Sequence, residues 1–160
     1  MATMDLASID LTTITGERTT FADVAGKATL VVNVASKCGF TPQYEGLERL
    51  WTTYRDRGLM VLGFPTNQFL QERRGEAAIA EFCRTTYGVT FPMFAKVHVN
   101  GRSQHPLFKA LTAIPDDSGD AGRVAWNFEK FLLLPGAARR FRSKVEPEDP
   151  QLVAAIEAAL

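Results

Sequence analysis

Short apolar runs alternate with segments whose apolar residues recur at helical spacing. Two runs are almost wholly apolar, ATLVVNVA at 28–35 and LMVLGFP at 59–65, as expected of strands buried on both faces of a sheet. Between them, 42–57 has a helical apolar pattern, with Pro42 suited to its first turn and Gly58 to its C-terminal cap. The pattern predicts two parallel strands joined by a right-handed crossover helix.

The remaining segments extend this alternation. Residues 6–11 and 19–21, with a turn at 15–17 between them, predict an N-terminal β-hairpin. Downstream we expect, in chain order, a helix over 76–87, a strand over 94–99, a short helix over 105–114, strands over 124–134 and 137–141, and a closing helix over 147–160. Strands that alternate with helices favour an α/β class, and the length favours one domain over 1–160.

Composition and charge narrow the classes of function. Lys and Arg together number 18, as do Asp and Glu, so nothing indicates a general affinity for nucleic acid or anionic membranes. No apolar run reaches the ~18–20 residues of a membrane span, and the start MATMDLASIDL lacks the features of a secretory signal. Two cysteines are too few for a disulfide-built scaffold, which favours free thiols in a reducing compartment such as the cytoplasm.

Cys38 gives the clearest chemical signal. It follows the 28–35 strand, at the edge where open α/β sheets place their sites. Ser36, Lys37 and Gly39 around it indicate a loop rather than an apolar layer, and a helical pattern follows at Pro42. The positive end of that helix and the Lys37 ammonium both favour the thiolate, so we expect an exposed, reactive thiol.

The residues near Cys38 favour one reaction over others. Thr41 stands where a Cys-x-x-Cys dithiol motif has its second cysteine, and a lone thiolate suits attack on peroxide to give a sulfenic acid. His98 and His105 read as surface or structural residues, which argues against acyl transfer and against a metal site. A thiol–disulfide oxidoreductase and a non-enzymatic peroxide sensor remain alternatives to a thiol peroxidase.

Five motifs carry a resemblance to a known family. NVASKCGFTPQYEGLE, GFPTNQF, FCRTTYGVTFPMFAKVHVNG, HPLFKAL and WNFEKFL occur in this order and resemble the glutathione peroxidase family in its cysteine form. The resemblance runs from about residue 31 to 131. It implies a thioredoxin-like fold, with a central mixed β-sheet flanked by helices, and reduction of hydrogen peroxide and organic hydroperoxides without a cofactor.

The resemblance also implies site residues. Cys38 matches the peroxidatic cysteine, and Trp126 and Asn127 match the family's Trp-Asn pair, whose N–H groups hold a thiolate and orient peroxide. The family's catalytic glutamine falls on Gln71, with Gln68 as the alternative.

The chain departs from the family pattern near that glutamine. NQFLQE is one residue shorter than the usual form and lacks its glycine, and Arg73-Arg74 follows where Pro-Gly is usual. Thr66 stands where many members carry a third cysteine. The loop over about 115–123 is short, as in monomeric members, so we expect a monomer.

The resemblance leaves two interpretations of Cys83. Thioredoxin-dependent members carry a resolving cysteine on this helix, but that position falls on Arg84, one residue later. Cys83 also shares an apolar stripe with Ile79 and Phe82. It is therefore either a core thiol or a resolving thiol whose helix must unwind before it reaches Cys38.

Cations near the site bear on the choice of reductant, because glutathione-dependent members bind the tripeptide's carboxylates with basic residues. The segments 37–43 and 126–130 contain only Lys37 and Lys130, although Arg73 and Arg74 add charge from the neighbouring loop. We therefore expect thioredoxin to be a better electron donor than glutathione.

Overall fold

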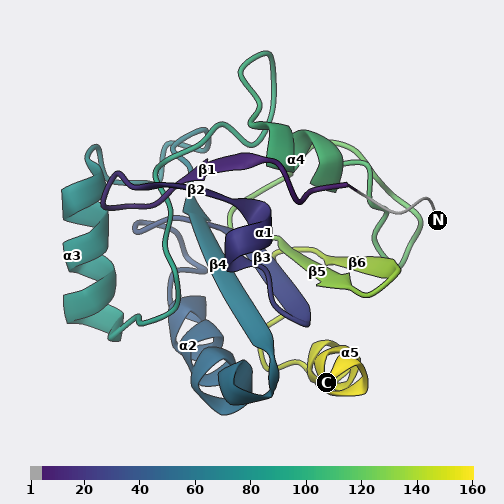
Figure 1. Ribbon diagram of the computed structural model, residues 1–160. Helices are drawn as coiled ribbons and strands as arrows, with labels where there is room; N and C mark the ends of the chain where they lie inside the picture. Colours follow the sequence, from purple (N-terminus) through teal and green to yellow (C-terminus); the bar gives the residue numbers. More distant parts are fainter. Residues whose placement is uncertain (1–4) are drawn as a thin grey trace.

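The computed structural model describes residues 5–160, and a four-stranded mixed sheet forms its centre (Figure 1). The N-terminal segment in which we expect no secretory signal begins with residues 1–4, which lie outside the described part. The strand order is β4-β3-β5-β6, with these bounds: β3 Ala28–Val34, β4 Leu59–Pro65, β5 Lys130–Leu134 and β6 Ala137–Phe141. β3 runs parallel to β4 and antiparallel to β5, and β5 is antiparallel to β6. The predicted parallel pair and the mixed sheet are confirmed.

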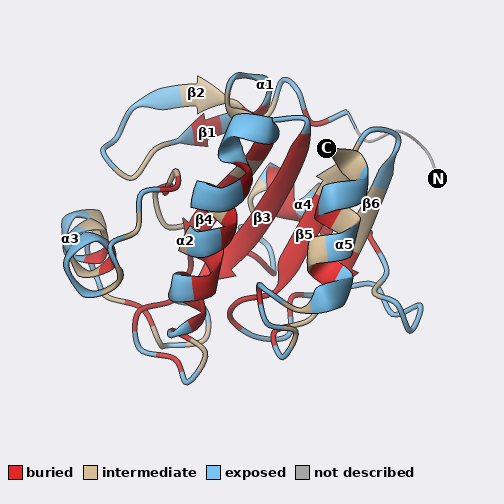
Figure 2. Cartoon of the chain, turned by 90° about the horizontal axis from the view of Figure 1, so that it is seen from below, coloured by how far each residue is buried: buried red, intermediate tan, exposed pale blue. Residues whose placement is uncertain are grey.

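Both faces of the sheet are covered, which explains the continuous apolar runs. Leu30, Val32 and Val34 pack into one core cluster, while Val31 packs into another, as alternation along a strand requires. Figure 2 shows two of the helices of the first face, α2 (Gln43–Tyr54) and α5 (Pro150–Ala159), crossing in front of the buried strands. α3 (Glu76–Tyr87) also contributes to that cluster, whereas α1 (Phe21–Val24) and α4 (Pro106–Leu111) contribute to the second.

The N-terminal hairpin is also confirmed. β1 (Asp10–Thr12) pairs antiparallel with β2 (Arg18–Thr20), and Gly16 takes the left-handed conformation in the turn, with φ of 92°. The short α1 follows β2 at once, which the sequence pattern did not predict. No helix in the described part of the chain is long and apolar enough to cross a membrane.

Two strand predictions were wrong. Residues 94–99 form no strand beyond an isolated bridge at Phe94, because successive N–H groups donate to different parts of the chain. Those of Ala95 and Val97 donate to the carbonyls of Thr12 and Pro65, and others donate to side chains. Glu76 accepts that of Lys96, and Gln68 accepts that of Val99. The strand expected over 124–134 begins only at Lys130, since the N–H of Val124 likewise donates to a side chain, Asn100 Oδ1.

Two helices, α4 and α5, are shorter than predicted, and each begins just after a residue whose side chain caps it. α4 is shorter than expected, and His105 caps it, with its Nδ1 accepting the N–H of Leu107 at 3.1 Å. α5 begins at Pro150, capped by Asp149, rather than at Pro147. Pro147 instead packs on α2 at Gly46, where an added Cβ would lie 3.1 Å from the proline ring. After α2 the short 3-10 helix η1 (Arg55–Arg57) ends at Gly58, as predicted for a cap, with φ of 115°.

Candidate active site around Cys38

Three loops meet beyond the carboxyl end of β3. They are residues 35–42 with Cys38, residues 66–75 with Gln71, and residues 124–129 with Trp126 and Asn127. The N–H of Lys37 donates to the Gln71 carbonyl at 2.9 Å, which joins the first loop to the second. The N–H of Phe128 donates to the carbonyl of Asn33 on β3 at 2.6 Å, which joins the third loop to the sheet. Candidate residues far apart in sequence therefore lie at one sheet edge.

Thr41 anchors the loop that carries the thiol. Its Oγ1 accepts the N–H of Cys38 at 2.9 Å and donates to the Ala35 carbonyl at 2.9 Å. The N–H of Phe40 points at the Cys38 Sγ, 3.4 Å away. This N–H can donate a hydrogen bond to the sulfur. The residue at the second position of a dithiol motif thus shapes the loop instead of supplying a second thiol.

Cys38 is less open than the sequence indicated. Its side chain is buried, with 8% of its surface exposed, and it belongs to the core cluster that contains Tyr44 and Phe128. The expectation of an exposed thiol was wrong, because the Thr41 hydrogen bonds fold the loop back onto the core. Only a small part of the Cys38 surface is therefore open to a reagent.

Asn33 fixes the loop that carries the Trp-Asn pair. Its Nδ2 donates to the Trp126 carbonyl at 2.9 Å, and its Oδ1 accepts the N–H of Glu129 at 3.2 Å. Phe128, bonded to the Asn33 carbonyl, takes a φ of 64° in this turn. Asn33 was not among the predicted site residues. A polar amide within the apolar run at 28–35 was a signal for it, because a buried amide needs hydrogen-bond partners.

Asn127 and Gln71 present their carboxamides to each other. Asn127 is fully buried, and its Nδ2 lies 3.4 Å from the Oε1 of half-buried Gln71, which is a long hydrogen bond. The Oδ1 of Asn127 is buried with no partner in the described protein. The Trp126 ring packs against Phe69, with ring centroids 5.2 Å apart, and is partly exposed. A weakly bonded pair of carboxamides remains available to a small polar molecule.

Gln68, the alternative to Gln71, bonds the backbone of Val99 and Asn100 and does not contribute to the Asn127 contact. Its Oε1 accepts the N–H groups of Val99 and Asn100 at 2.6 and 2.9 Å, and its Nε2 donates to the Asn100 carbonyl at 2.9 Å. The shortened loop still brings Gln71 to Asn127, because it turns sharply at Leu70, where φ is 59°. The structure therefore brings Gln71, and not Gln68, to Asn127.

Glu72 is a second residue that the sequence analysis did not assign. Its buried Oε1 accepts the N–H of Ser36 at 3.1 Å and that of Arg73 at 2.7 Å. Burial raises the pKa of this carboxyl above its ordinary value. Glu72 thereby ties the segment before Cys38 to the segment after Gln71.

Cys83 lies in the core and on α3. Its side chain is 2% exposed, within the same cluster as Ile79 and Tyr44. Burial raises the pKa of this thiol to about 11, so it is protonated at neutral pH and a poor nucleophile. Both Cys83 and Cys38 are free thiols in the structure.

Some of the cations expected near the site are occupied. Lys130 is fully buried, and its ammonium donates to the carbonyls of Ser143 and Val145. Burial lowers its pKa to about 7. The Arg73 guanidinium lies over the Phe82 ring, 4.5 Å from the centroid. Lys37, next to Cys38 in the chain, and Arg74, on the neighbouring loop, are exposed. The Lys130 ammonium therefore serves backbone carbonyls rather than a ligand's carboxylate.

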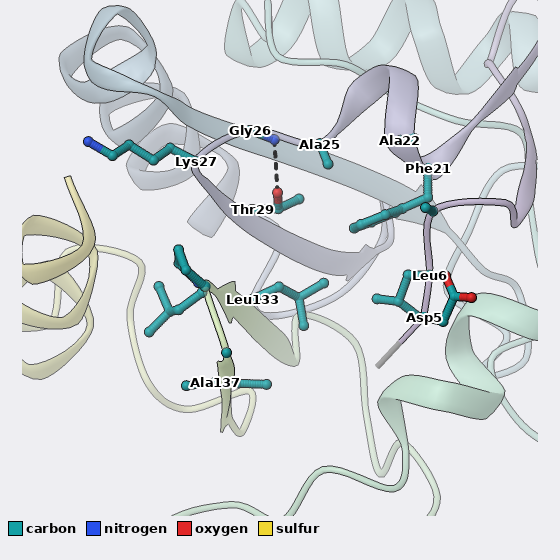
Figure 3. A pocket seen from close by; sticks show the side chains of 15 residues that line it. Asp5, Leu6, Phe21, Ala22, Ala25, Gly26, Lys27, Thr29, Leu133 and Ala137 are labelled. Carbon is teal, nitrogen blue, oxygen red and sulfur yellow. Dashed lines mark hydrogen bonds between the residues drawn. The ribbon is translucent and has the colours of Figure 1, made fainter. Parts of the chain in front are cut away.

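A cavity of about 460 Å³ lies at the opposite end of the sheet (Figure 3). Its lining comes from the start of β3, the region of α1 and the β5–β6 turn, and includes Leu6, Phe21, Lys27, Thr29, Leu133 and Ala137. It does not adjoin Cys38, which follows the carboxyl end of β3. Within residues 5–160, no group of three or more His, Cys, Asp or Glu side chains is placed to hold a metal ion.

The fold and the comparisons together define the class of protein. A free thiol follows the carboxyl edge of a thioredoxin-like sheet, on a loop bonded to the loop of Gln71, which in turn meets Asn127. This arrangement agrees with a thiol-dependent peroxidase. The family model described as "Glutathione peroxidase" matches residues 6–112, which is more than half of the chain. This chain therefore belongs to the glutathione peroxidase family.

Individual relatives agree with this assignment. The chain is 46% identical to "Thioredoxin/glutathione peroxidase BtuE" of Escherichia coli, over 92% of this chain and 92% of that protein. It is 50% identical to a "Glutathione peroxidase-like peroxiredoxin" of Chlamydomonas reinhardtii, again over 92% of each. The crystal structure described as "Trgpx in apo form" superposes with a TM-score of 0.73 at 36% identity, and covers 97% of each chain.

Proposed function

We propose that this chain reduces hydrogen peroxide and organic hydroperoxides at Cys38, and that thioredoxin returns Cys38 to its thiol form. The observation that carries the proposal is the joined pair of loops, in which Lys37 bonds Gln71 and Gln71 meets Asn127. This arrangement supports a site in which the carboxamide donors face the Cys38 sulfur. The relatives named as peroxidases and peroxiredoxins support the same reaction.

In the oxidative half-reaction, the Cys38 thiolate attacks the terminal oxygen of the hydroperoxide. The S–O bond forms as the O–O bond breaks, so sulfur is oxidised to a sulfenic acid and the alkoxide takes a proton from solvent to leave as an alcohol or water. The carboxamides of Asn127 and Gln71 and the indole N–H of Trp126 orient the peroxide and stabilise the charge on its leaving oxygen. The burial of Cys38 keeps other reagents away from Sγ.

In the reductive half-reaction, one thiol of reduced thioredoxin attacks the Cys38 sulfenic acid. A mixed disulfide forms and water leaves; the second thioredoxin thiol then displaces Cys38 as a thiol and leaves thioredoxin oxidised. Two observations favour this route over one through a Cys38–Cys83 disulfide. Cys83 is buried, and its raised pKa keeps it protonated. The relative named "Thioredoxin/glutathione peroxidase" supports a reductant of this type.

Two finer properties belong to the same proposal. We take the chain to act as a single-domain monomer, because the loop over 115–123 is short, and its mass in solution by light scattering tests this. We take its compartment to be the cytoplasm, where thioredoxin and glutathione keep thiols reduced. Fractionation of cells that produce the tagged protein tests the second property.

One coupled assay tests the main proposal. Purified protein is mixed with hydrogen peroxide, and NADPH consumption is followed with thioredoxin and its reductase, or with glutathione and its reductase. We expect turnover with thioredoxin to exceed turnover with glutathione. Cys38→Ser should abolish turnover while circular dichroism stays unchanged. A Cys38→Ser protein that kept most of its rate would overturn the assignment of Cys38.

A further inference from the structure

Two large apolar side chains stand out as exposed in the described part of the chain. Leu70 is 85% exposed and Trp126 is 36% exposed. They lie on the two loops that carry Gln71 and Asn127, and Phe69 joins them through its contact with the Trp126 ring. We call Phe69, Leu70 and Trp126 the apolar rim. The exposed apolar surface therefore lies on the two loops that meet the loop of Cys38 at the sheet edge.

The backbone at Leu70 holds its side chain outward. Its φ of 59° lies in the left-handed region, which a branched residue rarely adopts and which Gly or Asn accepts at lower cost. Asn67 fixes the turn, because its carbonyl accepts the N–H of Leu70 at 2.9 Å and its Oδ1 accepts the N–H of Glu72 at 3.1 Å. An exposed leucine in this conformation adds nothing evident to folding, so its side chain has another use.

The chemistry at Cys38 requires close approach of any protein reductant. A disulfide between two cysteines needs their Cα atoms within ~7 Å of each other. Cys38 is only 8% exposed. A thiol of another protein therefore reaches Sγ only if that protein's surface contacts the loops around Cys38. The bond between Lys37 and Gln71 places Leu70 beside this approach, one residue from Gln71. The rim therefore lies under a docked reductant.

The charge of this surface favours an apolar partner over a small anionic one. The rim residues are uncharged, the Lys130 ammonium is buried on backbone carbonyls, and the Arg73 guanidinium covers Phe82. Glutathione carries two carboxylates, and of the cations considered for the site only Lys37 and Arg74 are exposed, both outside the rim. A dithiol protein whose reactive cysteine lies within an apolar surface gains from burying the rim.

We propose that the apolar rim is the docking surface for a thioredoxin-type dithiol protein, with Leu70 as its main anchor. This inference rests on the proposed peroxidase function and names the surface on which its reductant binds. Docking precedes the attack of the partner's thiol on the Cys38 sulfenic acid, in which an S–S bond forms and water leaves. The partner's second thiol then attacks the partner's own sulfur in that bond, which forms a disulfide within the partner and releases Cys38 as a thiol.

Leu70→Asn and Leu70→Met separate docking from chemistry. Asn accepts the left-handed backbone and removes the apolar surface, whereas Met keeps an apolar side chain and serves as the matched control. With thioredoxin and its reductase, we expect Leu70→Asn to lower kcat/KM for thioredoxin by roughly tenfold, the effect of losing one buried leucine. We expect Leu70→Met to stay within about twofold of the original, as most tolerated surface changes do.

Two further arms show whether the loss belongs to docking. With dithiothreitol as the reductant, which needs no protein surface, both variants should turn over hydrogen peroxide at the original rate. Stopped-flow oxidation of Cys38 by hydrogen peroxide and by cumene hydroperoxide should also be unchanged. An unchanged kcat/KM for thioredoxin in Leu70→Asn would overturn the inference, as would an equal loss with dithiothreitol.

The remaining outcomes identify other uses of the rim. Slower oxidation by cumene hydroperoxide alone would assign the rim to the substrate, and loss of a dimer with unchanged thioredoxin kinetics would assign it to a second copy; either result overturns the inference. Turnover of the unaltered protein with glutathione only would also overturn it while the peroxidase function stands. Failure to consume peroxide with any reductant would overturn the proposed function itself.

Discussion

Glu72 holds the backbone of Ser36: the buried carboxyl accepts the Ser36 N–H at 3.1 Å, two residues before Cys38. The same oxygen accepts the N–H of Arg73, while the other oxygen is buried with no partner. One side chain thus fixes the spacing between the thiol loop and the loop that carries Gln71. Its burial costs the charged form free energy, which raises its pKa.

Glu72→Gln should change how stability depends on pH. Because the pKa of Glu72 is raised in the folded protein above its ordinary 4.5, the folded state binds more protons than the unfolded state as pH rises through this range. The protonated Glu72 carboxyl therefore stabilises the fold fully below about pH 4.5. This stabilisation is lost as pH rises from 4.5 through the raised pKa of the folded protein, where the carboxyl ionises. We expect the Tm of Glu72→Gln, relative to the original protein, to rise from pH 4 to pH 7. A constant difference across that range would contradict the prediction.

Asn127→Ala should slow oxidation of Cys38 by roughly 10²–10³-fold, the range for loss of one preorganised donor at a reacting centre. Asn127 is buried, and its Nδ2 is only weakly engaged by Gln71, so it is free to donate to peroxide. Trp126→Phe keeps the ring contact with Phe69 and loses only the N–H, and it should cost less. Stopped-flow rates measure both effects, with Tm as the control for folding. A rate for Asn127→Ala within threefold of the original would remove Asn127 from the site.

Gln71→Ala and Gln68→Ala should give opposite results. Gln71 meets Asn127, so its loss should slow oxidation with little change in Tm. Gln68 makes three hydrogen bonds to the backbone at 99–100, so its loss should cost about 1–3 kcal/mol of stability. Denaturant titration and stopped-flow oxidation of the two variants test this pair. The assignment fails if Gln68→Ala slows oxidation more than Gln71→Ala does.

Local patterns were enough to predict the core of the fold. The runs at 28–35 and 59–65 gave β3 and β4, and the helical spacing after Pro42 gave α2, because each pattern reflects burial on known faces. The position of Cys38 after β3 followed from the same argument. The resemblance then supplied the partners from the other two loops.

The contacts between loops could not be predicted from local sequence patterns. The alternation at 94–99 resembles a strand, yet the N–H groups of Lys96 and Val99 donate to side chains distant in sequence, those of Glu76 and Gln68. Periodicity does not reveal which polar side chain captures which backbone group. Asn33 and Glu72 were missed for this reason, since each acts on a loop far away in the chain.

Cys83→Ser should keep thioredoxin-linked turnover and lose stability. The thiol is buried beside the Tyr44 hydroxyl in an otherwise apolar cluster, and replacing it with the more polar serine hydroxyl costs about 1–3 kcal/mol. Cys83→Ala, which buries no polar group, serves as the control for that penalty. Mass spectrometry of peroxide-treated protein should find no Cys38–Cys83 disulfide. Such a disulfide, together with lost turnover in both variants, would make Cys83 the resolving thiol.

Lys130→Met should remove a rise in stability between pH 7 and pH 9. Burial lowers the pKa of Lys130 to about 7 from its ordinary 10.5, so across this window the unfolded chain binds more protons than the folded one. Stability from this group therefore increases as pH rises above 7. Above pH 9 the Cys83 thiol, with its pKa raised from 9.0 to about 11, makes stability fall as pH rises, so the measurement ends at pH 9.

In Lys130→Met, methionine keeps much of the apolar stem and carries no charge, but it loses the bonds to Ser143 and Val145. We expect its free energy of unfolding by urea to be lower at pH 9 and nearly flat between the two pH values. An equal rise in both proteins would show that Lys130 keeps its proton in the folded state.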